Sequence, residues 1–478
     1  MYDVAIIGCG VSGAACAYYL TRYKLKVAII EQHNDVCMET TKANSAIIHA
    51  GYDPEPGSVC ARYNVRGCEL AAEISEKLDV PYKRVGSLVV AFNEKDMAHI
   101  NKLYERGLVN GVPDMRILSQ KELRIFEPYI AEEALGALWA PTAGIINPWE
   151  YGLAMAEVAG TNGAELMLNT KVTGLERVDG VWQIACGDKT VEANYVINAA
   201  GVYSDEIHNM VAAPCFKIMP AAGEYYLLDK TEGKRANHVI FQCPDELGKG
   251  VLVSPTVHGN LIVGPNAIPS ERDDKSTKTS SLDFIRKMAS KSVPSVNYRD
   301  NIRNFTGVRA NSDTQDFQIG FAAEHFMDVA GIKSPGLSSA PAFAEDIVRM
   351  LGEDGLALEK KDDFIDKREH IRFKHLSAED KNKLIEEKPA YGRVICRCET
   401  ITEGEILAAL ASPIPPVSLD GIKRRAGTGM GRCQGGFCGP KVLGIMAAYK
   451  GVAPEEILQD DTGSYILTGE TKTGRDEA

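Results

Sequence analysis

The sequence lacks the features that mark membrane proteins, nucleic-acid-binding proteins and secreted disulfide-rich domains. No apolar run reaches the roughly 18 residues that a membrane-spanning helix needs. Basic residues do not predominate: 53 Lys and Arg stand against 65 Asp and Glu, for a formal net charge of −12, so nucleic-acid binding is not expected as a general property. The chain reads as a strand by Asp3, which leaves no room for a signal peptide. We expect a cytoplasmic protein without a direct membrane span, whose contact with any membrane is made through a partner.

The composition is otherwise ordinary for a folded protein. Hydrophobic residues make up 45% of the chain and charged residues 25%, which is typical of globular domains. A chain of 478 residues is too long for one core, and at about 150 residues per domain it predicts two to four domains.

The twelve cysteines are unevenly placed. A disulfide framework is not expected in the cytosol, where thiols stay reduced. Four cysteines cluster near the C-terminus, and each of the other eight is expected to be a small buried hydrophobic side chain. These eight are Cys9, Cys16, Cys37, Cys60, Cys68, Cys186, Cys215 and Cys243.

The strongest motif lies in residues 1–32, where two apolar runs flank a glycine-rich turn and a helix of small residues. The turn carries Gly8, Gly10 and Gly13, and the second apolar run ends at Glu31. This order predicts a βαβ unit whose helix N-terminus faces a pyrophosphate, with Glu31 placed to accept a hydrogen bond from a ribose hydroxyl. The segment therefore predicts dinucleotide binding.

Later segments extend this prediction. The stretch from Thr40 to Tyr52 is rich in hydroxyl and amide groups, which can bind a phosphate or a flavin ring without adding charge. A buried strand at Tyr195–Asn198 runs into a second turn of small residues, 199–201, so the dinucleotide domain is expected to be discontinuous. A helix is expected from near Ala340 to Leu351, with its N-terminal dipole favouring negative charge on a reduced ring.

The middle of the chain contains several short strands and one arginine in an apolar setting. Residues 215–305 are strand-rich and predict an antiparallel sheet over the cofactor. Arg309 lies in the apolar stretch Phe305–Ala310. It is either a surface cation or a buried anion-binding group.

The C-terminal cysteines form two close pairs, Cys396-x-Cys398 and Cys433-x4-Cys438, separated by 34 residues. Four thiolates in this arrangement can hold a [2Fe-2S] cluster or a tetrahedral zinc ion. Zinc sites favour C-x-x-C pairs, so the spacing favours iron-sulfur. The glycines around the second pair would leave backbone N–H groups to donate to cluster sulfurs.

Two resemblances follow from these motifs. Residues 393–440, with CRCE and GRCQGGFC, resemble the bacterioferritin-associated-ferredoxin-like [2Fe-2S] domain. Residues 1 to about 352 resemble the FAD-dependent D-amino-acid-oxidase-like superfamily, in the branch of glycerol-3-phosphate and L-2-hydroxyglutarate dehydrogenases. A fusion of these two parts resembles the anaerobic glycerol-3-phosphate dehydrogenases.

The resemblances imply an α/β fold with a Rossmann-like, discontinuous FAD-binding domain, an antiparallel-sheet substrate domain and a small helical [2Fe-2S] domain. The expected bounds are 1–75, 146–214 and 306–352 for the FAD-binding domain, 76–145 and 215–305 for the substrate domain, 353–390 for a linker, 391–450 for the cluster domain and 451–478 for a C-terminal tail.

The resemblances also imply site residues. His49 and Tyr226 match positions of the L-2-hydroxyglutarate dehydrogenases, and Arg309 matches the substrate-anion arginine of both dehydrogenase branches. These three are the expected catalytic residues. Cys396, Cys398, Cys433 and Cys438 are the expected cluster ligands. The FAD contacts are expected from Gly8, Gly10, Gly13, Glu31, Thr41, Asn44, Ser45, Val172, Gly201, Gly336, Leu337 and Ser338.

The expected reaction is oxidation of a small anionic secondary alcohol, with electrons passing through the cluster to a partner. Arg309 would hold the anion and His49 would accept the hydroxyl proton, a task that suits a neutral imidazole. Three alternatives stay open: a glycerol-3-phosphate dehydrogenase, an L-2-hydroxyglutarate dehydrogenase, and an electron-transfer subunit without a small-molecule substrate. One departure matters, because Asp53 follows His49 where glycerol-3-phosphate dehydrogenases usually carry an arginine.

Overall fold

The chain forms two compact units in the computed structural model, which describes residues 1–244, 250–469 and 471. The larger unit contains Met1–Gln32 and Val36–Arg368, and the smaller one contains His33–Asp35 with the described residues of Glu369–Ala478. Two predicted segments lie partly outside the described residues: 245–249 of the substrate domain, and 470 and 472–478 of the tail.

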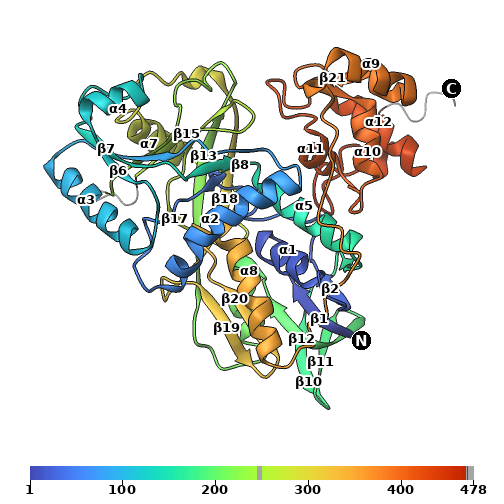
Figure 1. Cartoon of the computed structure of the whole chain (residues 1–478). Helices are drawn as coiled ribbons and strands as arrows, with labels where there is room; N and C mark the ends of the chain where they lie inside the picture. Colours follow the sequence, from blue (N-terminus) through green and yellow to red (C-terminus); the bar gives the residue numbers. More distant parts are fainter. Residues whose placement is uncertain (245–249, 470, 472–478) are drawn as a thin grey trace. The chain divides into compact units, whose positions relative to one another are not determined.

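The first sheet of the larger unit is built around the N-terminal glycine motif (Figure 1). Its strands are β1 (Tyr2–Ile7), β2 (Val27–Ile30), β9 (Glu165–Met167), β10 (Gly174–Val178), β11 (Val181–Cys186), β12 (Lys189–Asn198), β19 (Gln318–Ala323) and β20 (Phe326–Ala330). β1 pairs in parallel with β12 and β2, and β12 pairs in parallel with β20. The predicted βαβ unit therefore lies at the centre of a mainly parallel sheet.

Helices pack around this sheet. They are α1 (Val11–Leu20), α2 (Val59–Lys77), α5 (Pro148–Thr161), α6 (Ser204–His208) and α8 (Gly336–Glu353). α1 packs against α5 and α8 (Figure 1), which explains why its small side chains are almost all buried. α8 begins at Gly336, earlier than the predicted start near Ala340, because the N–H groups of Ser338 and Ser339 already donate to the Pro335 carbonyl.

The second sheet of the larger unit carries the predicted substrate-side strands. They are β5 (Ser87–Ala91), β6 (Arg116–Ser119), β7 (Gly136–Ala140), β13 (Ile218–Leu228), β14 (Val239–Gln242), β15 (Leu252–Pro255), β16 (Leu261–Gly264), β17 (Ile268–Pro269) and β18 (Asn301–Ser312). Pairing is antiparallel throughout this sheet except between β14 and β5. Helices α3 (Glu94–Val109), α4 (Gln120–Phe126) and α7 (Thr279–Ala289) accompany it, and β3 (Ile47–Ile48), β4 (Tyr82–Lys83) and β8 (Gly144–Ile146) form a separate small sheet.

The longest strand pair, β13 with β18, determines which side chains share a face. Arg309 lies opposite Ala221, and Phe305 lies opposite Tyr225. Because successive side chains in a strand point to opposite faces, Tyr225 shares a face with Arg309, whereas Tyr226 points to the other side.

The smaller unit is mainly helical. Its helices are α9 (Ala378–Glu387), α10 (Glu403–Leu410), α11 (Leu419–Ala426) and α12 (Gly439–Lys450), and β21 (Val394–Cys396) pairs with β22 (Ile401–Thr402). Ile406, Ile422 and Met446 are fully buried at its core. The predicted fold class, an α/β body with a small helical C-terminal domain, is confirmed.

The finer domain bounds stay a proposal. The two sheets of the larger unit support its division into a cofactor-binding and a substrate-binding part. β18 continues the second sheet to Ser312, beyond the proposed boundary at residue 306.

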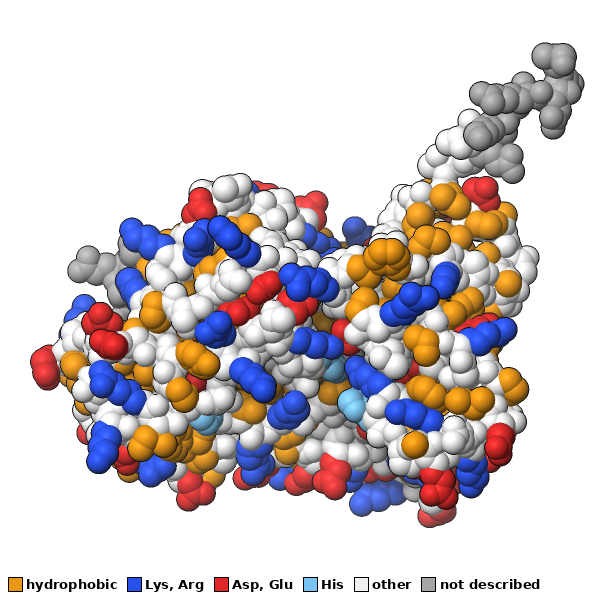
Figure 2. All heavy atoms as spheres, turned by 90° about the horizontal axis from the view of Figure 1, so that it is seen from above, with side chains coloured by type: hydrophobic (Ala, Val, Ile, Leu, Met, Phe, Trp, Pro, Cys, Tyr) orange, Lys and Arg blue, Asp and Glu red, His pale blue; other side chains and the backbone are white. Residues whose placement is uncertain are grey.

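Within residues 1–244, 250–469 and 471, no helix combines the length and the apolar character that crossing a membrane requires. Lys and Arg side chains are interspersed with Asp and Glu on the face shown in Figure 2.

Candidate active site and cysteine cluster

The first glycine turn has no room for a side chain. Gly8 has a φ of +97°, and a β-carbon there would lie 2.6 Å from the Ala199 carbonyl oxygen. This contact brings the first turn against the second turn of small residues, which ends at Gly201. The two turns predicted to bind the cofactor are thus adjacent.

The start of α1 has the form of a phosphate site. Its N-cap residue is Gly10, which provides no side-chain cap, and Gly13 lies in its first turn. The Val11 N–H donates to the Thr41 hydroxyl at 3.0 Å, which brings the 40–46 loop to this helix end. Uncapped N–H groups at a helix start bind phosphate readily.

The acid at the end of β2 is buried beside this turn. Glu31 is 7% exposed, and its carboxylate accepts a hydrogen bond from the Cys9 N–H at 2.7 Å. The Glu31 carbonyl accepts from the Thr170 N–H at 2.8 Å, close in the chain to the buried Val172. The glycine turns, the helix start with glycine as its N-cap residue, and this carboxylate fit the ADP half of a dinucleotide.

The loop after β2 is braced by its own amide side chain. The Asn44 amide donates to the carbonyls of Thr40 and Thr41, and its oxygen accepts from the Ala46 N–H. Ser45 lies 3.0 Å from the Tyr225 hydroxyl. This loop therefore joins the helix start to the Arg309 face of the second sheet.

His49 lies beside the start of α8. Its backbone N–H donates to the Ser338 hydroxyl at 2.7 Å, and its Nε2 is 3.2 Å from the Ser334 hydroxyl. The ring stacks on Phe241 at 5.5 Å between centroids. The structure thus brings His49 together with the predicted flavin-facing turn at Gly336, Leu337 and Ser338.

Arg309 is half-buried without a carboxylate partner. Its Nη2 donates to the Asn266 carbonyl at 3.1 Å, and among residues 1–244, 250–469 and 471 it forms no ion pair. The Asn266 side-chain nitrogen is buried and has no hydrogen-bond partner within the same ranges. Two donors at one place are suited to a small anion.

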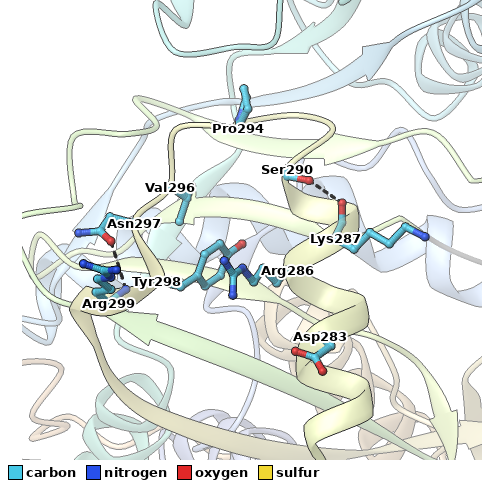
Figure 3. Close-up of a pocket in the computed structure, with 9 residues that line it drawn as sticks. All are labelled: Asp283, Arg286, Lys287, Ser290, Pro294, Val296, Asn297, Tyr298 and Arg299. Carbon is cyan, nitrogen blue, oxygen red and sulfur yellow. Dashed lines mark hydrogen bonds between the residues drawn. The ribbon is translucent and has the colours of Figure 1, made fainter.

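Tyr226 lies away from these groups. It packs on Tyr298 at 4.9 Å between ring centroids, in the core cluster beside α7, and desolvation raises the pKa of its hydroxyl. A surface pocket of about 820 Å³ adjoins Tyr298, and Figure 3 shows Arg286 extending beside this tyrosine. None of the predicted site residues lines this pocket. Tyr225 is the tyrosine of this strand that contacts the cofactor loop.

The four C-terminal cysteines form two contacting pairs, Cys398 with Cys433 and Cys396 with Cys438. The sulfurs of Cys398 and Cys433 are 3.6 Å apart, close to the roughly 3.8 Å expected of two thiolates on one tetrahedral metal at about 2.3 Å. A hydrogen bond from the Cys396 thiol, the largest effect, lowers the pKa of Cys438 to about 7. No three or more His, Cys, Asp or Glu side chains in the described ranges are arranged for a single metal ion. Two thiolate pairs fit a two-iron cluster.

Backbone N–H groups surround these sulfurs. Gly429 donates to both Cys396 and Cys438, and Gly435 donates to Cys433. Donors of this kind tune the potential of an iron-sulfur cluster. The glycines that the sequence predicted as donors therefore include two that contact the sulfurs of expected ligands.

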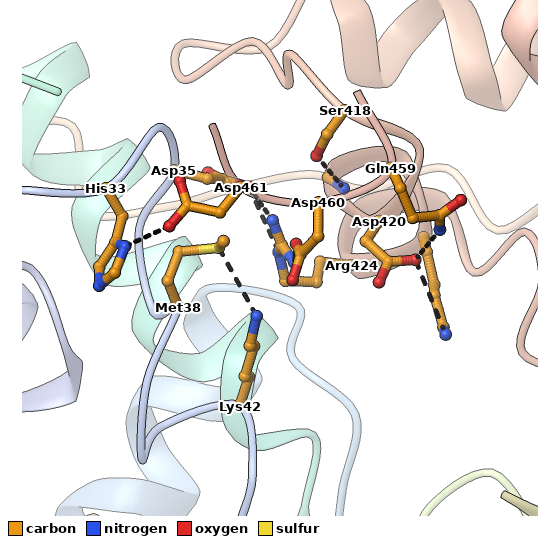
Figure 4. Close-up of polar contacts among 12 residues, drawn as sticks. His33, Asp35, Met38, Lys42, Ser418, Asp420, Arg424, Gln459, Asp460 and Asp461 are labelled. Atoms are coloured by element: carbon orange, nitrogen blue, oxygen red, sulfur yellow. Dashed lines mark hydrogen bonds and ion pairs between the residues drawn. The ribbon is translucent and has the colours of Figure 1, made fainter. Parts of the chain in front are cut away.

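A buried ion cluster ties the segment His33–Asp35 into the smaller unit (Figure 4). The Asp35 carboxylate accepts hydrogen bonds from Arg424 and Arg425, and Arg424 also pairs with Asp460. Asp35, Arg424 and Arg425 are all under 9% exposed. A short segment directly after the βαβ unit is thus part of the core of the C-terminal unit.

Sequence reasoning missed several contacting residues. Tyr225 contacts Ser45, Ser334 contacts His49, and Asn266 contacts Arg309. Strand alternation next to Tyr226 was the signal that could have identified Tyr225. The expectation that all eight scattered cysteines are buried is wrong for Cys215, whose thiol is exposed because its loop lies outside the core.

Comparison with known proteins identifies both parts of the chain. Residues 3–350 match the family described as "FAD dependent oxidoreductase", and residues 394–448 match the "BFD-like [2Fe-2S] binding domain". A protein of Caloramator mitchellensis named "Glycerol 3-phosphate dehydrogenase" is 47% identical over 479 residues, covering 99% of each chain.

Two further relatives match the larger unit. The solved structure "Dithionite reduced L-alpha-Glycerophosphate Oxidase from Mycoplasma pneumoniae with FAD bound" is 33% identical with a TM-score of 0.73, over 77% of this chain and 98% of that one. The L-2-hydroxyglutarate dehydrogenase of Escherichia coli (strain K12) is 31% identical over 274 residues, or 56% of this chain and 64% of that protein. The cofactors implied by the sequence, FAD and a [2Fe-2S] cluster, are confirmed, and the chain belongs to the FAD-dependent oxidoreductase family, with a C-terminal BFD-like [2Fe-2S] domain.

Proposed function

We propose that this protein is an FAD-dependent dehydrogenase that oxidises glycerol 3-phosphate to dihydroxyacetone phosphate. The observation that carries this proposal is the similarity over 99% of both chains to a protein named glycerol 3-phosphate dehydrogenase, because it includes the flavoprotein part and the cluster part together. The enzyme is proposed to act in the cytoplasm.

Substrate binding is assigned to the face of the second sheet that carries Arg309. Its guanidinium would bind the substrate anion, and the Asn266 amide nitrogen would donate a further hydrogen bond. Both donors are suited to this role because neither has a carboxylate partner in the described ranges. Tyr225, on the same face, would replace Tyr226 as the tyrosine next to the site.

Proton transfer is assigned to His49. FAD, when bound, accepts the hydride that leaves the alcohol carbon. The His49 imidazole would take the hydroxyl proton at Nε2, the atom that lies 3.2 Å from the Ser334 hydroxyl. Ser334 and Ser338 hold the residue from two sides, which limits how far the ring can move.

Electron exit is assigned to the cysteine cluster. Cys396, Cys398, Cys433 and Cys438 would hold the [2Fe-2S] group, which carries electrons one at a time. A two-electron donor joined to a one-electron carrier implies a separate redox partner protein or electron acceptor.

The sequence also supports two other functions. Oxidation of L-2-hydroxyglutarate is favoured by Asp53, which stands where an additional cation for phosphate is expected, and by the similarity to dehydrogenases of that acid. An electron-transfer subunit would use the same two cofactors without oxidising a small molecule.

An anaerobic reduction experiment distinguishes the three functions. The holoprotein is mixed with glycerol 3-phosphate or with L-2-hydroxyglutarate, and the visible flavin absorbance is followed. Rapid bleaching by glycerol 3-phosphate alone is expected. Bleaching only by the hydroxy acid would assign the second function, and bleaching by neither would favour the electron-transfer subunit.

A further inference from the structure

A chain of contacts in the larger unit links an exposed thiol to a buried acid. The Cys215 sulfur is 3.4 Å from Nε2 of His208. The Nδ1 atom of the same imidazole is 2.6 Å from the Asp328 carboxylate. These three residues come from the loop after α6, from α6 itself and from β20.

The three residues differ in solvent exposure. The side chains of His208 and Asp328 are 3% and 6% exposed. Of the eight cysteines outside the C-terminal cluster, Cys215 is the exposed one and the other seven are buried. A surface sulfur is therefore backed by a buried imidazole and carboxylate.

The buried acid is held in place from behind. The Asp328 carboxylate also accepts from the Asn198 amide at 2.7 Å, and that amide donates in addition to the Ser204 carbonyl at 2.8 Å. The Asn198 side-chain oxygen accepts from the Ala200 N–H. Asp328 is thus fixed in the orientation that faces His208.

The contacts decide which nitrogen can act as a base. A carboxylate accepts hydrogen bonds only, so the proton of a neutral His208 belongs on Nδ1, and the lone pair of Nε2 can accept from the thiol at 3.4 Å. Once protonated, Nε2 gains the Ala213 carbonyl as an acceptor at 3.1 Å. Both N–H groups of the imidazolium are then satisfied.

Desolvation, with the carboxylates of Asp328 and Asp313, raises the pKa of Cys215. A thiol of this kind reacts as a nucleophile when an adjacent base removes its proton, and a third group that orients the base completes the arrangement.

We propose that Cys215 is a modification site that reacts with small disulfides, with His208 as its base and Asp328 as the residue that positions His208. The Cys215 sulfur attacks one sulfur of the disulfide, so a new S–S bond forms as the old one breaks. His208 takes the thiol proton and returns it to the departing thiolate. One disulfide and one thiol enter, and one mixed disulfide and one thiol leave, so atoms and electrons balance.

The test is the rate of exchange between the holoenzyme and the chromogenic disulfide 5,5′-dithiobis(2-nitrobenzoic acid) at pH 6.5. The wild-type protein is expected to release one equivalent of the coloured thiolate in a fast phase, at least about tenfold faster than free N-acetylcysteine. This leaving group stays ionised at pH 6.5, so His208 passes its proton to solvent. Cys215→Ser removes this phase. His208→Gln and Asp328→Asn, the second of which keeps the size of the side chain, each slow it by about a hundredfold.

Matched controls separate this role from general damage. His325→Gln removes a partly exposed imidazole that also lies near an aspartate, Asp354, and should leave the fast phase unchanged. Circular dichroism identifies any variant that fails to fold. If His208→Gln fails to fold, the rate of the wild-type protein relative to that of N-acetylcysteine still tests whether Cys215 is activated. Any one of three results would overturn the proposal. The fast phase could persist in Cys215→Ser, or the wild type and Asp328→Asn could react at equal rates. The third result is a wild-type rate no greater than that of the free thiol.

Discussion

At the scale of single residues, the proposed active site depends on two side chains that enter from different elements. His49 follows β3 and is held by hydroxyl groups near the start of α8. Arg309 lies in β18 and is held by one carbonyl of the chain before β17. Their roles are separable, because one binds charge and the other moves a proton.

Replacing Arg309 is expected to weaken substrate binding. A hydrogen bond to a charged group contributes about 1.5–3 kcal/mol, so Arg309→Met should raise the KM for glycerol 3-phosphate by about 10- to 100-fold. Steady-state kinetics with a one-electron dye measure this change. Arg303→Met, at an exposed position of the same strand, should leave the KM unchanged. An equal rise in both variants would exclude a specific role for Arg309.

Replacing His49 is expected to slow chemistry and spare the cofactor. His49→Gln removes the base, which contributes about 100- to 10,000-fold to proton transfer. Stopped-flow bleaching of the flavin should slow accordingly, while the FAD content of the purified protein stays at the wild-type value. His99→Gln, in α3, is the control. Unchanged bleaching in His49→Gln would remove this residue from the mechanism.

At the scale of elements, the site rests on close contact between a strand and a loop. β18 passes so near the loop after β2 that a β-carbon at Gly307 would lie 1.8 Å from the Ala43 carbonyl oxygen. Phe305 and Arg309 flank this glycine on the same face. The strand that carries Arg309 is therefore held against the proposed cofactor loop.

A methyl group at this contact should separate the two elements. Gly307→Ala is expected to cost about 1–3 kcal/mol of stability through overpacking and to weaken FAD retention on gel filtration. Gly160→Ala, at the end of α5 where a β-carbon meets no atom within 4 Å, should be neutral or slightly stabilising. Equal melting temperatures and FAD content in the two variants would contradict this account.

The elements also show which parts of the site were predictable. The glycine turn, the acid after β2 and the cysteine spacing depend on local sequence, and the βαβ unit was predicted from it. The side chain that faces the site on β13 was not, because a motif that contains both Tyr225 and Tyr226 identifies the strand but not its face. The contact of His208 with Asp328 and the contacts of Asp35 with its arginines join residues more than a hundred positions apart, which no local pattern encodes.

At the scale of the whole molecule, the chain has two compact units and two cofactors. FAD accepts two electrons from a substrate, and a [2Fe-2S] cluster carries one at a time. The smaller unit includes three residues from the beginning of the chain, and Asp35 is its buried anion. Burial alone would raise the pKa of Asp35, but Arg425 and Arg424 outweigh it and hold this pKa well below its usual range.

Removing this carboxylate should destabilise the smaller unit. Asp35→Asn leaves the buried Arg425 guanidinium without its anion and Arg424 with Asp460 alone, which costs roughly 3–5 kcal/mol. Since the pKa is lowered in the folded state, the stabilisation is fully present above the unfolded value of about 3.9 and is lost as the pH falls below it. The difference in melting temperature between wild type and variant should therefore shrink below about pH 4. A difference that is constant down to pH 3, or one equal to that of the exposed Glu386→Gln, would contradict this.

Breaking the cysteine cluster should separate the two half-reactions. Cys433→Ser removes one proposed ligand, so glycerol 3-phosphate is expected to bleach the flavin at the wild-type rate while reduction of a one-electron dye falls about tenfold or more. Electron paramagnetic resonance of the reduced protein reports the loss of the cluster. Cys215→Ser should change neither reaction. Dye reduction at the wild-type rate without a cluster signal would show that electrons leave from the flavin.

The contact between Asp35 and Arg425 also constrains the order in which the protein is made. The two residues are 390 positions apart, so at about 5–20 residues per second the ribosome delivers the arginine roughly 20–80 s after the aspartate. During that interval Asp35 lacks the two arginines that it binds in the folded protein. The smaller unit can therefore complete its core only after Arg424 and Arg425 have been made, and a fragment that starts at Glu369 would lack the buried Asp35 carboxylate.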